Sequence, residues 1–296
     1  MDILDISASL KYLQHNGVGL NCEEKLQLEL GLQQLLSLNY QGEISDFEEL
    51  LLWGKINGLN ADYYIAMGIN YNYQYEFPQK LFYYALSTNF HKDKYNELKS
   101  LILGVPDKLI GDPVEPVKNE DDIAQDESAQ PKEIDPLASS ESEDEAAKIV
   151  KINLKEIDRV HYIVRAIEND CQIAPQGAFK LTTSHEVNRN EAFRGLSLED
   201  AFNLSSYSHF RNVQQKEKKE GLEKDDSIFS KNFLDDLTSD KPNGQWAIQK
   251  DSTGRVAIIR NFQWPGFFAY HKAGSKTFGS FYIGEGLKNS ELPFML

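Results

Sequence analysis

Residues 246–283 read WAIQKDSTGRVAIIRNFQWPGFFAYHKAGSKTFGSFYI. Four short runs in this stretch, at 246–249, 256–262, 267–270 and 278–283, are rich in aromatic and β-branched residues, and glycine or proline lies between them. Such runs are typical of β-strands, and short connections join strands that are antiparallel neighbours. The stretch therefore predicts an antiparallel meander of four strands.

A similar pattern lies nearer the N-terminus. Residues 50–56 and 62–67 predict two strands, with Asn57-Gly58 as the hairpin turn between them. Residues 81–86 predict a third strand and form the longest unbroken apolar run of the chain. Because these strands do not alternate with long helices, the pattern argues against a doubly wound nucleotide-binding fold.

The first forty residues predict two helices. The first ends near Asn16-Gly17, a pair that favours a left-handed stop. In the second, Asn21 can cap the N-terminus with Glu24 as its capping-box partner, and seven leucines follow between residues 26 and 38. We expect these leucines to pack on their own domain, but they cover more than one narrow stripe, so partner binding is an alternative.

The region after residue 148 predicts further helices before the meander begins. Residues 154–168 carry apolar side chains on one helical face, and Ser197 with Asp200 is typical of the start of a short helix. Residues 216–226 have mixed charge and predict an exposed loop or a frayed helix.

Residues 113–148 differ from the rest of the chain in composition. They contain 12 acidic and 3 basic residues, four of the ten prolines, and no Phe, Tyr or Trp. Such a segment cannot bury enough apolar surface to offset its ordering entropy, so we expect a disordered acidic linker or insertion. Ser140 and Ser142 each precede an acidic residue by three positions, which makes them candidate phosphorylation sites. A solvated spacer without regulation is the simpler interpretation.

Together these patterns predict an α+β fold, in which N-terminal helices and an antiparallel β-sheet or meander are interrupted by a disordered acidic loop. We expect an N-terminal part at 1–112 with helices and the first strands, the linker at 113–148, and a C-terminal part at 149–296 with a helix and antiparallel strands. The two flanking parts either share one sheet or form separate domains, and the sequence leaves both open.

The 296-residue chain has a net charge of −15 at pH 7. Residues 113–148 contribute −9, residues 1–112 contribute −7 and residues 149–296 contribute +1. This balance argues against binding to nucleic acid or to an anionic membrane, since both require clustered Lys and Arg. The acidic start and the short apolar runs lead us to expect a soluble intracellular protein.

The sequence shows no clear motif for catalysis or metal binding. The six histidines lack metal-site spacings, and Cys22 and Cys171 match neither a redox nor a metal motif. No GxSxG elbow, P-loop or GxGxxG fingerprint is present. We therefore predict no catalytic residue, cofactor or metal, and keep as an alternative an enzyme whose site assembles from distant residues.

The chain is rich in aromatic residues, several of them next to glycine or proline, and a single core cannot easily bury all of them. Successive strand residues point to opposite faces, and aromatic side chains that remain outside the core commonly anchor protein interfaces. The sequence leaves open whether these positions serve the core or an interface. The structural or interface candidates are Trp53, Gly54, Gly58, Tyr63, Tyr64, Trp264, Pro265 and Gly266.

Several sequence blocks resemble the radial spoke head family. LWGKINGL at 52–59 followed by ADYYIA at 61–66 is similar to its signature. The later blocks follow in order as FRGLSL at 193–198, LSSYSHFR at 204–211, WPG at 264–266, YH at 270–271, YIGEGLKN at 282–289 and LPFML at 292–296. The likeness spans most of the chain, whereas the acidic segment 113–148 is longer than the family pattern.

The resemblance implies a non-enzymatic structural subunit of the radial spoke head, in the cytoplasm and cytoskeleton of the ciliary axoneme. It implies relatives of radial spoke head proteins 4 and 6 and other spoke subunits as partners, with indirect or transient contact to the central pair apparatus. The subunit would be needed for spoke head assembly and for relaying central pair contact to dynein-driven motility. The alternative is an adaptor or scaffold subunit of another cytoskeletal complex.

Overall fold

The computed structural model describes residues 1–3, 6–40, 47–71, 77–86, 156–222 and 231–295. All of these lie in one of the two units into which the chain divides. The acidic segment 113–148, with Ser140 and Ser142, lies outside the described residues.

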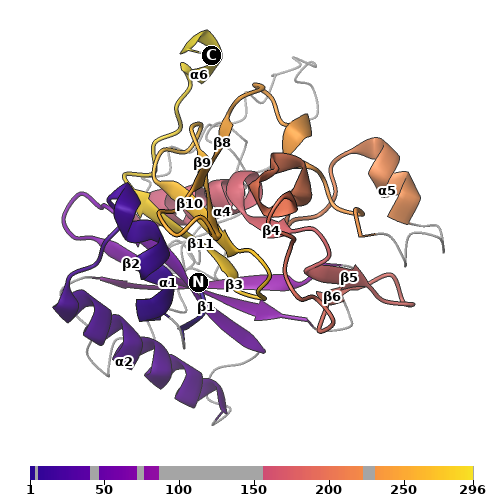
Figure 1. Cartoon of the computed structure of the whole chain (residues 1–296). Coiled ribbons are helices and arrows are strands. Elements are labelled where there is room, and N and C mark those ends of the chain that lie inside the picture. The colour runs from indigo at the N-terminus through magenta and orange to yellow at the C-terminus, as the bar shows by residue number, and fades with distance from the viewer. Residues whose placement is uncertain (4–5, 41–46, 72–76, 87–155, 223–230, 296) are drawn as a thin grey trace, which may run out of the picture. The chain divides into compact units, whose positions relative to one another are not determined.

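A mixed seven-stranded sheet organises the described part of the chain (Figure 1), in the order β3-β2-β1-β11-β10-β9-β8. Strands from before and after the acidic segment therefore belong to one sheet, and the predicted α+β class with a C-terminal antiparallel meander is confirmed. The strands are β1 (Glu49–Ile56), β2 (Tyr63–Asn70), β3 (Gln79–Leu86), β8 (Trp246–Lys250), β9 (Val256–Asn261), β10 (Phe267–Lys272) and β11 (Phe278–Gly284).

The two groups of strands meet at a short parallel pairing between β1 and β11, which the sequence did not predict. Only three residue pairs join them, from Gly54 with Tyr282 to Ile56 with Gly284. Toward the other ends of β1 and β11 the chain start supplies the contact instead, because Leu52 N–H donates to the Met1 carbonyl at 2.8 Å and Asp2 bridges to Leu51. The sheet therefore forks between β1 and β11.

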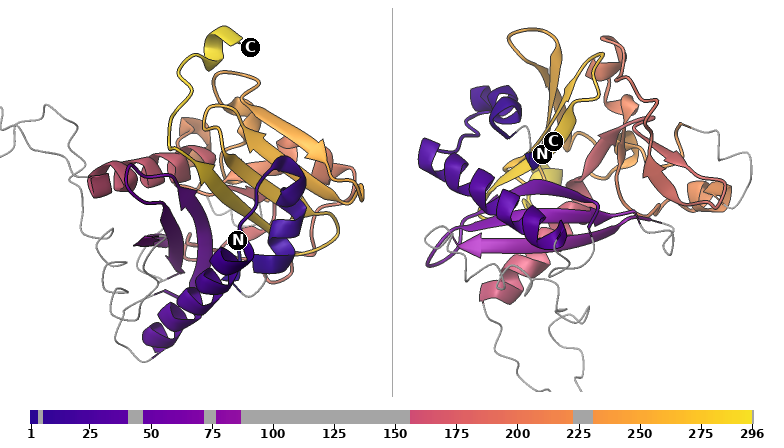
Figure 2. Two further views of the ribbon diagram at one scale, coloured as in Figure 1. Left: turned by 90° about the vertical axis from the view of Figure 1, so that its left-hand side faces the viewer. Right: turned by 90° about the horizontal axis from the view of Figure 1, so that it is seen from below.

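Helices cover both faces of this sheet (Figure 2). One face carries α1 (Ile6–Leu13), η2 (Gln14–Asn16) and α2 (Cys22–Tyr40), and the other carries α4 (Glu156–Cys171). Each face has its own apolar cluster, one built from α1 and α2 side chains and the other from α4 side chains, each with residues of the sheet. Among the described residues, no helix is long and apolar enough to cross a bilayer.

The predicted helix ends of the N-terminal region are confirmed. Gly17 adopts a left-handed conformation with φ of 78° directly after η2. Asn21 and Glu24 form the capping box, since Glu24 N–H donates to Asn21 Oδ1 at 2.7 Å and Asn21 N–H donates to Glu24 Oε2 at 2.8 Å.

One local expectation, the turn after β1, needs correction. Asn57-Gly58 does not make a tight hairpin turn, because six residues, 57–62, separate β1 from β2 and the left-handed glycine positions lie elsewhere. The leucines of α2 are divided, with Leu28 and Leu32 buried but Leu26 and Leu30 exposed.

Short elements complete the α4 side of the sheet. The helix expected at Ser197 appears as η6 (Asp200–Phe202), with the Ser197 hydroxyl donating to Asp200 Oδ2 at 2.7 Å. The expected frayed helix is α5 (Lys216–Leu222). The other elements are β4 (Ile173–Pro175) paired with β7 (Tyr207–His209), β5 (Phe179–Leu181) paired with β6 (Val187–Arg189), η7 (Leu204–Ser206), η9 (Leu237–Ser239) and α6 (Leu292–Met295).

Candidate functional site

The helix α4 is the element that joins the two groups of strands. Its inner side carries Val160, Ile163, Val164 and Ile167 at helical spacing, and all four are buried. They pack in one cluster with Trp53 and Ile56 of β1 and with Ile259 and Phe267 of the meander. The burial of each such side chain stabilises the fold by about 1.5–3 kcal/mol.

Near its C-terminal end, α4 holds the first group of strands through a buried carboxylate. Glu168 accepts the indole N–H of Trp53 at 2.8 Å and the ammonium group of Lys80 at 2.6 Å. Lys80, on β3, also donates to the Phe210 carbonyl at 2.6 Å and lies 4.7 Å from the Phe210 ring centroid. The Glu168 carboxylate is therefore buried with partners, and the partly buried Lys80 ammonium completes the ion pair.

Two residues later, α4 holds the second group of strands in the same way. Asp170 accepts the indole N–H of Trp264 at 3.0 Å and forms an ion pair with Lys288 at 3.0 Å. Burial acts to raise the pKa of Asp170, but the hydrogen bonds from Trp264 and Lys288 outweigh it and the pKa is lowered. This side chain is therefore held in its charged form.

The first turn of α4 is fastened to both groups by one arginine. Arg159 pairs with Glu156 through two hydrogen bonds, of 2.9 Å from Nε and 2.6 Å from Nη2. The same guanidinium donates to the carbonyl oxygens of Asn57, after β1, at 3.5 Å and Glu285, after β11, at 3.3 Å. Both ends of α4 thus contact strands from before and after the acidic segment.

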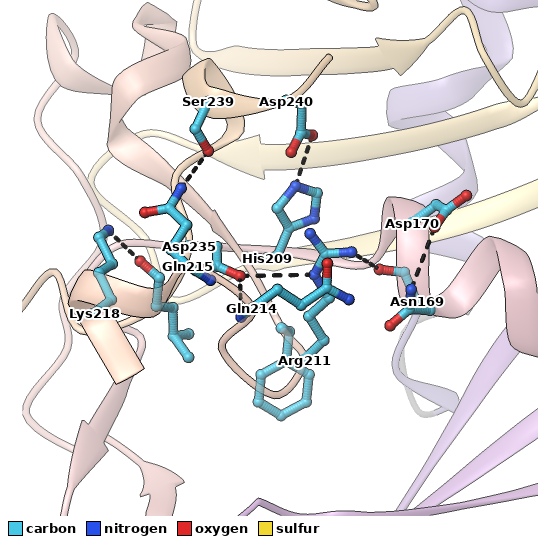
Figure 3. A network of polar contacts seen from close by, with 12 residues as sticks. Asn169, Asp170, His209, Arg211, Gln214, Gln215, Lys218, Asp235, Ser239 and Asp240 are labelled. Carbon is cyan, nitrogen blue, oxygen red and sulfur yellow. Dashed lines mark hydrogen bonds and ion pairs between the residues drawn. The ribbon is translucent and has the colours of Figure 1, made fainter. Parts of the chain in front are cut away.

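A polar network continues beyond the end of α4 (Figure 3). Arg211 donates to the Asn169 carbonyl at 2.8 Å, and Asp235 accepts the backbone N–H groups of Gln214 at 2.8 Å and Gln215 at 3.2 Å. These bonds tie the irregular segments around β7 to the helix. Each bond joins a side chain to the main chain of a different segment, so the network holds these segments together.

The third tryptophan repeats the pattern of the other two. Trp246 donates its indole N–H to Asp240 Oδ2 at 2.8 Å, and His209 Nε2 lies 2.7 Å from the same oxygen. His209 Nδ1 has no hydrogen-bond partner among the described residues, so this pair lacks a nucleophile in the position that a hydrolytic triad requires. In the described part of the chain, no group of three or more His, Cys, Asp or Glu side chains is arranged to hold a metal ion.

Five of the sequence candidates lie on β1 next to β11 or in the turn from β9 to β10. Trp53 and Trp264 are buried on the α4 face. A Cβ atom at Gly54 would collide with the Tyr282 carbonyl oxygen, and one at Gly266 with that of Ile283. Gly54 thus permits the close β1–β11 pairing, while Gly266 (φ of 101°) and its exposed neighbour Pro265 form the turn from β9 to β10.

The other three candidates lie around the β1–β2 connection, on both faces of the sheet. Tyr63 packs 5.9 Å from the Tyr84 ring, and a Cβ at Gly58 would collide with the Ala61 carbonyl oxygen. Tyr64 is buried on the opposite face, where its hydroxyl donates to Glu24 Oε1 of α2 at 2.5 Å.

Sequence reasoning missed the four charged residues that fasten α4, namely Lys80, Arg159, Glu168 and Asp170. One signal was present, because Glu168 and Asp170 lie in the last turn of the helix, where acidic groups are unfavourable beside the negative end of the helix dipole. Carboxylates at this end of a helix need hydrogen-bond donors or cations from other elements to offset the unfavourable interaction. The sequence did not indicate that these donors include Trp53 and Trp264.

A cavity of about 240 Å³ lies at the fork between β1 and β11. Its lining combines apolar rings, such as Phe179 and Phe278, with polar groups that are already paired. Ser280 donates to Gln172 Oε1 at 2.7 Å, and Arg189, also in the lining, forms an ion pair of 2.5 Å with Glu49. Among the described residues, none of the buried side-chain atoms that lack a hydrogen-bond partner lies in this lining.

The buried polar groups described above bind partners on other elements of the same chain. They are typical of a scaffold protein, in which one helix fastens a sheet built from two groups of strands. A family model described as "Radial spokehead-like protein" matches residues 1–161. The chain belongs to this family.

Relatives with assigned names agree over the whole length. The chain is 32% identical over 298 residues to "Radial spoke head protein 9 homolog" of Mus musculus, 31% identical to that of Homo sapiens and 30% identical to that of Bos taurus. Each alignment covers 100% of both chains. The resemblance noted from the sequence blocks is confirmed, and it identifies a structural component of the radial spoke head in the ciliary axoneme.

Proposed function

We propose that this protein is a non-enzymatic subunit that the radial spoke head needs for its assembly. The observation that carries the proposal is the full-length similarity to proteins named radial spoke head protein 9 homolog. Relatives of radial spoke head proteins 4 and 6 and other spoke subunits are the proposed partners. The subunit would help relay contact with the central pair apparatus to dynein-driven motility.

A mechanical role requires a body that keeps its shape under load. Relayed force is lost if the β1–β3 and β8–β11 groups can rotate about their short junction, in which three residue pairs join β1 and β11. Glu168 and Asp170 of α4 oppose such rotation, because one binds Trp53 of the first group and the other binds Trp264 next to the second. The stiffness is therefore a property of buried contacts and needs no reaction centre.

Reconstitution with defined subunits tests the proposal. We expect the purified chain to form a stable heteromer with co-expressed relatives of head proteins 4 and 6 in size-exclusion chromatography. In cells, we expect the chain to be lost from axonemes that lack radial spokes. Retention on such axonemes at an unchanged level would instead indicate an adaptor of another cytoskeletal complex.

The acidic segment is proposed to act as a spacer. Deletion of residues 113–148 should leave both the thermal unfolding midpoint and the heteromer with the head subunits unchanged, because the contacts described above that fasten α4 join residues outside this segment. Substitution of Ser140 and Ser142 by Asp should likewise leave assembly intact. Loss of co-purification after the deletion would contradict the spacer role.

A further inference from the structure

Of the nine large apolar side chains that are exposed among the described residues, five lie on α4, beside its start or after β11. We call residues 285–295 the C-terminal arm. Three of its side chains, Leu287, Phe294 and Met295, are 65%, 90% and 71% exposed. Leu59 and Tyr162, beside the first turns of α4, are also largely exposed.

The first half of the arm is fastened to α4 and to β11 at successive residues. The Glu285 carbonyl accepts from Arg159 at 3.3 Å, and Gly286 N–H donates to the Tyr282 hydroxyl at 2.9 Å. Gly286 has φ of 73°, and a Cβ atom there would lie 2.7 Å from Ile163 Cγ2, so the arm passes close against the helix. Because its neighbours on either side contact the body, Leu287 is presented outward.

The second half of the arm is anchored before its apolar end. Asn289 N–H donates to the Gln263 carbonyl at 2.7 Å, and Leu292 is buried. Phe294 and Met295 follow on α6, which stands away from the sheet in Figures 1 and 2. The anchors hold the arm while its largest apolar side chains remain in water.

This arrangement suits binding to another molecule. Exposed Phe and Met side chains gain free energy on burial, and both are frequent at binding surfaces. A segment whose backbone is already fixed also loses less conformational entropy when it binds. Holding Phe294 and Met295 in water adds nothing to the stability of this chain, so the anchored arm is better explained by binding to another molecule.

The charges of the arm indicate the chemistry of its partner. Lys288 is neutralised by its ion pair with Asp170, whereas Glu285 and Glu291 are exposed and form no ion pair with a described residue. The free charge of the arm is therefore negative. A second copy of this chain, with a net charge of −15, would be repelled.

We propose that the C-terminal arm inserts Phe294 and Met295 into an apolar pocket with a basic rim on a neighbouring spoke head subunit, with Leu287 at the edge of the contact. This inference rests on the proposed function and names the surface that carries it. The pocket accepts two large apolar side chains, and basic residues at its rim pair with Glu285 and Glu291.

The test compares two double variants of the full chain, each with two exposed apolar residues replaced. Phe294→Ser with Met295→Ser alters the arm, and Leu26→Ser with Leu30→Ser alters the outer side of α2 as a matched control. Binding to the co-expressed head subunits is measured by biolayer interferometry. We expect the arm variant to bind at least about tenfold more weakly and the control variant to bind like the unmodified chain.

Two further measurements separate the outcomes. Glu285→Lys with Glu291→Lys should weaken binding and reduce its dependence on salt. The unfolding midpoint of the two arm variants should remain unchanged, whereas the control should unfold at a slightly lower temperature, because Leu26 and Leu30 are 58% and 51% exposed on a helix in which serine is less favourable than leucine. If the arm variant binds the head subunits as tightly as the unmodified chain does, the proposal that the arm is a binding surface is wrong and the proposed function is unaffected. A Phe294-dependent dimer in sedimentation would overturn the choice of partner, and failure of the unmodified chain to bind would overturn both proposals.

Discussion

The two faces of the sheet are covered by helices that are fastened in different ways. On one face, α1 and α2 bury apolar side chains such as Leu10, Leu28 and Leu35, and the polar contacts of α2 with the sheet centre on Glu24 at one end of the helix. Glu24 and its partner Lys55 are partly exposed, at 22% and 14% of their side chains. On the other face, both ends of α4 are fixed by polar contacts, and the side chains of Glu168 and its partner Lys80 are 7% and 13% exposed, so the difference lies in the carboxylates.

This difference follows from what each face has to hold. On this face α2 binds Lys55 and Tyr64 of the first group, whose long antiparallel ladders carry one irregularity between Leu52 and Gly54, while α1 contacts β9 and β10 of the second group. The α4 face covers the junction of β1 and β11, where three residue pairs join the two groups. Buried directional bonds are found where the backbone pairing is weakest, so loss of an α4 contact should cost far more than loss of an α2 contact.

The largest effect is expected from Glu168→Ala. The substitution leaves the partly buried Lys80 ammonium without its carboxylate and removes the acceptor of the buried Trp53 indole. Breaking a buried pair by removing one partner destabilises a protein by about 3–5 kcal/mol. Urea unfolding monitored by tryptophan fluorescence measures the change.

A second variant separates charge burial from packing. Lys80→Met added to Glu168→Ala removes the unpaired charge and should recover part of the lost stability. A double variant as unstable as Glu168→Ala alone would show that the ion pair does not account for the loss.

A pH-dependent effect is expected on the α4 face from His271. Burial lowers the pKa of this imidazole to about 4, and the hydrogen bond to the Thr277 carbonyl opposes the shift only in part. Since the pKa in the unfolded chain is near 6.5, the unfolded state binds more protons between pH 6.5 and 4, and stability falls as the pH is lowered through this range. The full contribution is about 3 kcal/mol.

The measurement is the free energy of unfolding at several pH values for the unmodified chain and for His271→Gln. Glutamine can still accept the Leu196 N–H that donates to His271 Nε2 at 3.2 Å. Between pH 4 and pH 6.5, the free energy of unfolding of His271→Gln should change less steeply with pH than that of the unmodified chain. Equal slopes would assign the acid sensitivity to other groups.

A smaller effect is expected from Gly54→Ala at the junction itself. The new Cβ would collide with the Tyr282 carbonyl oxygen, so β1 and β11 must separate. Overpacking of this kind costs about 1–3 kcal/mol. Gly221→Ala is the matched control, because a Cβ in α5 meets no atom within 4 Å and alanine favours helix, so thermal unfolding of this variant should be unchanged or slightly stabilised.

Local patterns predicted the elements better than they predicted their assembly. The alternation of apolar runs and turns gave the C-terminal strands, and Asn21 with Glu24 gave the start of α2, because each signal depends on residues close in sequence. The pairing of Lys80 with Glu168 joins residues 88 positions apart, and the parallel contact of Gly54 with Tyr282 spans the acidic segment. Neither leaves a local periodicity. The strands β4 to β7 have three residues each, too few for an alternation to be recognised.

The smallest effect is expected on the α2 face, from Asn21→Ala. This change removes one half of the capping box, since Asn21 Oδ1 no longer accepts the Glu24 N–H. Loss of an N-cap costs about 1 kcal/mol. Because Glu24 also binds Tyr64 and Lys55, α2 should stay on the sheet, and the loss should not disturb the α4 contacts. Near-ultraviolet circular dichroism should therefore show an unchanged tryptophan signal for Asn21→Ala, whereas Glu168→Ala should alter it; a similar spectral change in both variants would mean that the two faces are not fastened independently.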